Sequence, residues 1–197
     1  YRTRFKVLLA GSHTLEEFQR WAGYLINAQT IHLSYLNEAE ATQLIERPVR
    51  DFPLRYQPAA RAAILQLTRG HPYLIQLLCA ELINLKNGQA PDIRRLARRS
   101  DVDAVIPETL AIGDQFFMDI QLNQIEPDSL TVLHALAKQS ATAAVHWTAL
   151  LAHLPDSQRL TRVLAQLRRR ELIEETDGCY SFQVELIRRW FAGEHWI

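Results

Sequence analysis

The sequence has 197 residues, of which 48% are hydrophobic and 22% charged, and this composition excludes wholesale disorder and a fibrous repeat. Its 22 lysines and arginines are balanced by 22 aspartates and glutamates, so no global basic field indicates nucleic-acid binding, and no apolar run reaches the roughly 20 residues that span a membrane. Two cysteines, Cys79 and Cys179, are too few for a disulfide scaffold and favour a reducing, cytoplasmic location. Because the chain begins at Tyr1 with no signal peptide, we expect it to be part of a longer protein.

The N-terminal part of the chain has the pattern of the end of an α/β domain. The short apolar run at 5–10 has the length of a strand that is buried on both faces. Thr14, followed three residues later by Glu17, makes a capping-box pattern that predicts a helix over 15–24. A second strand is predicted over 31–34. A strand, a helix and a strand at this spacing are typical of a parallel sheet.

Helical signals dominate the middle of the chain. Asn37 and Glu40 repeat the capping-box pattern and predict a helix that ends at Arg47, because Pro48 follows. A weaker apolar pattern predicts one more helix over 101–124.

Proline and glycine mark the bounds of two further helices. Pro58 begins a helix that stops at Gly70, and Pro72 begins the next, which stops at Gly88. Apolar residues at helical spacing support both: Ala60, Ala63, Ile64 and Leu67 in the first, and Leu74, Leu77, Leu78, Leu82 and Leu85 in the second. Cys79 lies in the second helix, where we expect it to fill the core rather than act as a nucleophile.

The order of elements predicted after residue 127 is that of a winged helix-turn-helix domain: three helices, a hairpin and a closing helix. The predicted bounds are 129–138, 147–154 and 156–170 for the three helices, 172–176 and 179–182 for the strands, and 185–191 for the closing helix. The hairpin rests on Asp177 and Gly178, because an Asp-Gly pair between two β-like runs is a strong hairpin signal.

Together, these segments resemble the C-terminal part of a P-loop ATPase of the AAA+/STAND type, in its archaeal and bacterial ATPase branch; STAND denotes signal-transduction ATPases with numerous domains. An apolar strand ends in a small polar residue, Ser12, and the segment 31–40 resembles the family's entry into a helical lid. The sequence Gly70-His71-Pro72 matches the Gly-x-Pro motif of that lid, with Tyr73 following it. The winged helix ends in a segment similar to the family's, Tyr180-Ser181-Phe182 followed by Leu186-Ile187-Arg188-Arg189-Trp190.

The resemblance covers nearly the whole chain and implies a mainly α protein with three parts. Residues 1–36 would be the C-terminal remnant of an α/β P-loop ATPase domain, 37–127 a helical lid with a connecting helix, and 128–197 a winged helix domain. It implies a nucleotide-dependent signalling switch as the function.

The resemblance also implies roles for two groups of residues. Ser12 would be sensor-like, with its hydroxyl bonded to the γ-phosphate or the attacking water; alternatively it is a turn residue that caps the next helix. Gly70, His71, Pro72 and Tyr73 would contact adenine, so that the orientation of the lid follows whether ATP or ADP is bound. The plainer alternative is that glycine ends one helix and proline starts the next.

The phosphate-binding parts of the family are missing from this sequence. None of the seven glycines precedes a lysine, so the Gly-x-x-x-x-Gly-Lys-Ser/Thr loop is absent, and the family's magnesium-binding acidic strand is absent as well. We therefore expect no catalysis and at most weak ATP binding by this chain alone, with ATP or ADP and Mg²⁺ bound by an intact parent. The expected partner is the parent's upstream nucleotide-binding core, and the open edges of the strand at 5–10 allow self-association. The seven histidines form no ligand-like pair, so no metal site is expected.

A DNA-binding regulator is the alternative function. The third helix of the winged helix exposes Arg159, Arg162, Gln166 and Arg169, which could contact guanine edges and phosphates. Against this, residues 128–197 carry no net charge, and in STAND proteins the winged helix commonly clamps the nucleotide domain shut. A second cationic cluster, Arg94, Arg95, Arg98 and Arg99, has the spacing of a solvated helix face.

Overall fold

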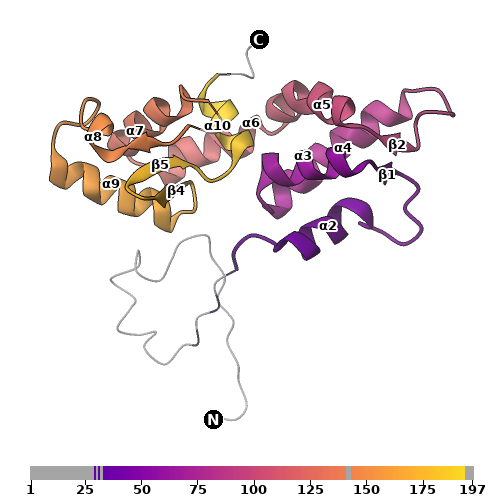
Figure 1. Cartoon of the computed structure of the whole chain (residues 1–197), viewed down its shortest axis with the longest axis horizontal. Coiled ribbons are helices and arrows are strands. Elements are labelled where there is room, and N and C mark those ends of the chain that lie inside the picture. Colours follow the sequence, from indigo (N-terminus) through magenta and orange to yellow (C-terminus); the bar gives the residue numbers. More distant parts are fainter. Residues whose placement is uncertain (1–28, 30, 32, 141–142, 194–197) are drawn as a thin grey trace. The chain divides into compact units, whose positions relative to one another are not determined.

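The computed structural model describes residues 29, 31, 33–140 and 143–193, and its helices and strands are shown in Figure 1. The chain divides into two compact units, 1–34 and 35–197. The strand predicted over 5–10, the helix predicted over 15–24 and Ser12 lie outside the described residues. Ile31, Leu33 and Ser34 are described and belong to no strand, so the strand predicted over 31–34 is wrong for these residues. An apolar run makes a strand only where another backbone pairs with it.

Four helices form the lid: α2 (Glu38–Glu46), α3 (Pro58–Thr68), α4 (Pro72–Asn87) and α5 (Arg99–Ile112). The predicted capping box is confirmed, since the Asn37 side chain accepts from the Glu40 N–H and the Glu40 carboxylate accepts from the Asn37 N–H, both at 3.0 Å. Pro58 and Pro72 lie in the first turns of their helices, where proline's missing N–H costs nothing. Cys79 is buried in α4 as predicted.

A short parallel sheet, which the sequence does not predict, closes one end of the lid. Strand β1 (Arg55–Tyr56) pairs with β2 (Leu96–Ala97). The Arg55 N–H donates to the carbonyl of Arg95 at 2.9 Å, and the Gln57 N–H donates to the carbonyl of Ala97 at 3.0 Å. Strands of two residues have no alternation that a sequence pattern could reveal.

The single helix predicted over 101–124 is wrong. The segment forms α5, then α6 (Asp114–Asp119), then a π-helix, η2 (Ile120–Gln124). Gly113 separates α5 from α6, and a Cβ atom there would lie 2.7 Å from Leu77 Cδ2 and 2.9 Å from Phe117 Cε2. A larger residue at this position would require the Leu77 and Phe117 side chains to shift.

The remaining elements have the order and sheet topology of a winged helix. They are α7 (Pro127–Ala137), β3 (Val145–His146), α8 (Trp147–Leu150), α9 (Ser157–Arg169), β4 (Ile173–Thr176), β5 (Cys179–Phe182) and α10 (Glu185–Phe191). The strands form an antiparallel sheet in the order β3-β5-β4, in which β3 was not predicted. The hairpin is confirmed: Asp177 and Gly178 have φ of 51° and 75°, as a two-residue turn with positive φ at both positions requires.

The second helix of the winged helix is shorter than predicted. Instead of running over 147–154, α8 ends at Leu150, and the N–H groups of Ala152 and His153 bond three residues back, to Ala149 and Leu150. The chain thus tightens into turns before Pro155, which has no N–H with which to continue a helix.

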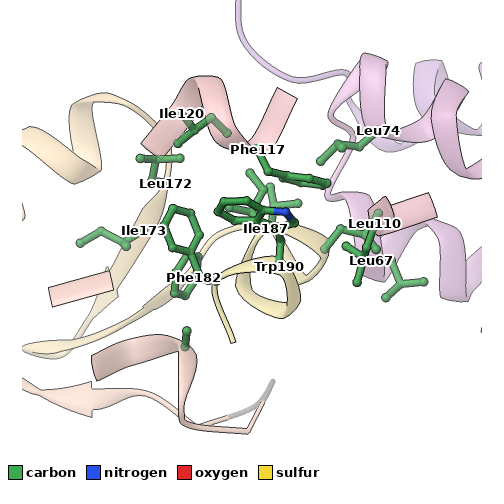
Figure 2. Close-up of a cluster of buried hydrophobic side chains, with 14 of the residues drawn as sticks. Leu67, Leu74, Leu110, Phe117, Ile120, Leu172, Ile173, Phe182, Ile187 and Trp190 are labelled. Carbon is green, nitrogen blue, oxygen red and sulfur yellow. The ribbon is translucent and has the colours of Figure 1, made fainter. Parts of the chain in front are cut away.

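One continuous cluster of buried apolar side chains joins the lid to the winged helix. Figure 2 shows Leu67, Leu74 and Leu110 of the lid meeting Phe117 of α6 and Ile187 and Trp190 of α10. On α9 the apolar side chains of Leu160, Val163, Leu164 and Leu167 are buried. The fold is therefore mainly helical, with small sheets. Among the described residues no helix is long and apolar enough to cross a membrane, and no three potential ligand side chains are grouped as a metal site would need.

Candidate functional site

The backbone between α3 and α4 makes a tight corner at Gly70. Arg69 and Gly70 both have positive φ, 49° and 83°, and the Leu36 N–H donates to the Gly70 carbonyl at 2.9 Å. A Cβ atom at Gly70 would lie 2.2 Å from the carbonyl oxygen of Leu36. Glycine is thus required for both the left-handed conformation and the close approach of the segment that leads into the lid.

The three residues after Gly70 start α4 and face partly outward. His71 is the N-cap, and its Nδ1 accepts from the Leu74 N–H at 3.5 Å. Burial lowers the pKa of His71, so the ring is neutral near pH 7 and keeps the lone pair that this cap needs. Pro72 is half-buried, and Tyr73 is 42% exposed, with its ring centroid 4.7 Å from that of Phe116.

A series of rings runs from this corner into the winged helix. We call it the aromatic series: Tyr35, His71, Phe116, Phe117 and Trp190. Successive ring centroids are 5.0, 5.4, 5.3 and 5.6 Å apart. The last pair is stacked, with an interplanar angle of 21°. These spacings lie within the range of favourable aromatic contacts, so the corner and α10 are joined by unbroken packing.

Hydrogen bonds fix the two ends of the aromatic series. At one end the Tyr35 hydroxyl donates to the backbone carbonyl of Glu171 at 3.1 Å, just before β4. Burial raises the pKa of Tyr35, so the hydroxyl stays protonated and remains a donor. At the other end the Trp190 indole N–H donates to the Asp114 carboxylate at 2.9 Å. The lid entry, α6 and the winged helix therefore hold one another in a defined arrangement.

The polar face of α9 contains the four residues of the DNA-binding alternative. Arg159, Arg162 and Arg169 are exposed and Gln166 is half-buried. Arg159 is engaged with Asp128, at 2.5 Å from Nη2 to the carboxylate. Arg162 and Arg169 have no ion pair with the part of the chain that the structure describes.

The wing beside this face is acidic. Glu174, Glu175 and Asp177 lie on β4 and its turn. Glu174 pairs with Arg69 of the lid at 2.6 Å, and Glu175 pairs with Arg168 of α9. Carboxylates repel phosphate, and these two also occupy arginines, so the wing weakens the case for DNA binding by α9.

The four consecutive residues Gly70, His71, Pro72 and Tyr73 form this corner, and their contact with a nucleotide stays a prediction. The aromatic partners Tyr35, Phe116 and Trp190 were not predicted as part of the site, because they lie far away in sequence and nothing in their local pattern marks them. The family resemblance included the segments around Tyr35 (31–40) and Trp190 but gave neither residue a role in the site.

Comparison with known proteins gives a likeness in structure alone. Neither a family model nor a curated protein matches the sequence. Among solved structures, a Walker-type ATPase of Pyrococcus abyssi matches with a TM-score of 0.60 and 16% sequence identity, over 90% of this chain and 49% of that one. The chain therefore spans about half the length of that ATPase. At this identity the match shows the fold: it resembles part of a Walker-type ATPase.

Proposed function

We propose that the chain is the lid and winged-helix portion of a longer P-loop ATPase of the AAA+/STAND type and acts there as a nucleotide-dependent signalling switch. The observation that carries the proposal is the corner at Gly70, which presents Pro72 and Tyr73 outward and is joined to α10 by the aromatic series. The structural likeness to half of a Walker-type ATPase supports the same reading.

The corner residues suit the base of a nucleotide rather than the phosphates. The half-buried Pro72 and the partly exposed Tyr73 ring offer apolar surface, and the neutral His71 adds no charge. The sequence has no glycine-rich lysine loop to hold phosphates. In this proposal ATP or ADP, with Mg²⁺, would be held through its phosphates by the core of the parent protein, and ATP would supply a hydrolysable γ-phosphate there. Ser12 would sense that phosphate.

Movement at the corner would reach the winged helix through packed groups. The Leu36–Gly70 hydrogen bond ties the lid entry to the corner, so a shift of α4 displaces Tyr35 as well. Tyr35 is bonded to Glu171, and Phe117 is stacked on Trp190. Because packed interiors move as units rather than deform continuously, a reorientation of α4 would move β4 and α10 with it.

The test uses the parent protein, including the segment that precedes Tyr1. That segment should contain the glycine-rich lysine loop and an acidic strand. Pro72→Ala and Ser12→Ala should change nucleotide exchange and turnover and leave the fold intact. Pro58→Ala is the matched control, since Pro58 also opens a lid helix but lies outside the corner. A preceding segment without the loop, or equal kinetics for the Pro72 and Pro58 variants, would refute the proposal.

A further inference from the structure

Within residues 33–140 and 143–193, the lid carries a concentration of exposed positive charge apart from α9. Arg47, Arg50, Arg55, Arg94 and Arg95 are all exposed, and we call them the lid basic patch. Arg94 and Arg95 lie in the turn before β2 rather than on the helix face that their spacing predicted. That turn is held against β1, since the Arg55 N–H donates to the Arg95 carbonyl at 2.9 Å; Figure 1 shows the two strands side by side.

These arginines are free to bind an anion. Within the part of the chain that the structure describes, their single ion pair is a long one, 3.9 Å between Arg50 and Asp51, with both side chains more than 90% exposed. The neighbouring Glu46 is occupied by Arg61 at 2.7 Å. On α9 fewer arginines are available to bind an anion, because Arg159 and Arg168 already pair with carboxylates.

Two hollows bring the arginines together around one apolar segment. The first, of about 770 Å³, is lined by Arg47, Arg50 and Arg55, and the second, of about 310 Å³, by Arg94 and Arg95. Both are also lined by Phe52 and Leu54, so they adjoin. The two hollows therefore meet at the segment of Phe52 and Leu54, with arginines among the lining residues of each, and Glu46 and Asp51 also line the first.

We propose that these adjoining hollows bind single-stranded nucleic acid through its phosphate backbone. Guanidinium groups bind phosphate oxygens in a two-pronged fashion, and a basic groove with an aromatic ring between its sides is how non-specific single-strand sites are built. The net charge of zero does not oppose this, because the field that a strand meets is the local one. The proposal is independent of the nucleotide switch, since it involves neither the corner nor α10.

The experiment measures the anisotropy of a labelled oligothymidylate of about 20 nucleotides against the 197-residue chain, between about 50 and 200 mM salt. Two lid variants, Arg94→Gln with Arg95→Gln and Arg47→Gln with Arg55→Gln, each remove two unpaired arginines. Arg162→Gln with Arg169→Gln on α9 is the matched control, with the same loss of charge. Each lid variant should lower the slope of log K against log salt by about 1.4, at about 0.7 per phosphate contact, and the control should leave it unchanged.

The proposal is overturned if the α9 variant lowers the slope and the lid variants do not, or if the wild-type chain shows no salt-dependent binding at the lowest salt. It is also overturned if polyglutamate displaces the oligonucleotide more strongly than unlabelled oligothymidylate of equal charge does, because the patch would then suit an acidic protein. Circular dichroism melts of all three variants should match the wild type, since none of the six arginines replaced makes an ion pair within the described chain.

Discussion

Replacing Gly70 by alanine adds one methyl group at the point where the lid entry meets the corner. Two costs follow from the geometry. At the φ of 83° found at Gly70, which is in the left-handed region, a residue with a Cβ lowers the stability of the fold by about 1–2 kcal/mol. The new Cβ would also lie 2.2 Å from the Leu36 oxygen, so the entry segment must retreat and give up the Leu36–Gly70 hydrogen bond, worth about 1 kcal/mol. Together we expect a loss of about 2–3 kcal/mol in the free energy of unfolding.

The assay is urea and thermal unfolding of the 197-residue chain, followed by circular dichroism. For a protein of this size the expected loss lowers Tm by about 5–10 °C. Gly193→Ala is the matched control: Gly193 has nearly the same φ, 80°, but none of the described atoms lies within 4 Å of its added Cβ. It should cost only the conformational part, about 1–2 kcal/mol. If both variants lose the same free energy, the contact with Leu36 is not a constraint and the argument for a fixed corner fails.

The other predictions concern α10, pH and nucleotide. Trp190→Phe should lower the free energy of unfolding by about 1–3 kcal/mol in urea melts, because it leaves the half-buried Asp114 carboxylate without its indole donor. A loss no larger than that of a substitution at an exposed position would contradict this. Burial raises the pKa of Glu185, but hydrogen bonds from Arg188 and Arg189 outweigh it and hold the pKa below its usual range. Its stabilisation is therefore full above the unfolded-state pKa of about 4.3 and is lost as the pH falls through the lower folded value. Melts from neutral to acidic pH should show a shallower fall for Glu185→Gln than for the wild type, and parallel curves would exclude Glu185 as the cause. Calorimetry should find no micromolar ATP affinity for the 197-residue chain, and such an affinity would overturn the assignment of phosphate binding to the parent.

The sequence predicts the elements whose ends are encoded locally. Asn37 with Glu40, Pro72, and Asp177 with Gly178 specify a helix start, a second helix start and a hairpin turn through their own backbone preferences, and all are confirmed. The two-residue strands β1, β2 and β3 could not be predicted from the sequence, because they are defined only by pairing with another strand. The break at Gly113 was not predicted, because the apolar helical pattern continues across it; the structure packs Gly113 beside the side chains of Leu77 and Phe117.

The candidate site divides in the same way. The Gly-x-Pro motif is contiguous and can be recognised in the sequence, whereas the aromatic series joins residues from four separate stretches of chain. Tyr35, Phe116 and Trp190 are linked through His71 and Phe117 only once the chain is folded. Whether Ser12 acts as a sensor stays a prediction.

The packing of α10 against α3 has a consequence for synthesis of the protein on the ribosome. Leu67 of α3 shares its buried cluster with Ile187 and Trp190 (Figure 2), and α10 contacts α3 directly. At about 5–20 residues per second, α10 is made on the order of 10 s after α3 has emerged. Throughout that interval the nascent lid exposes the apolar surface of α3 that α10 covers in the folded chain. Chains that terminate before Glu185 should therefore aggregate or be retained by chaperones, even though every lid helix is already complete.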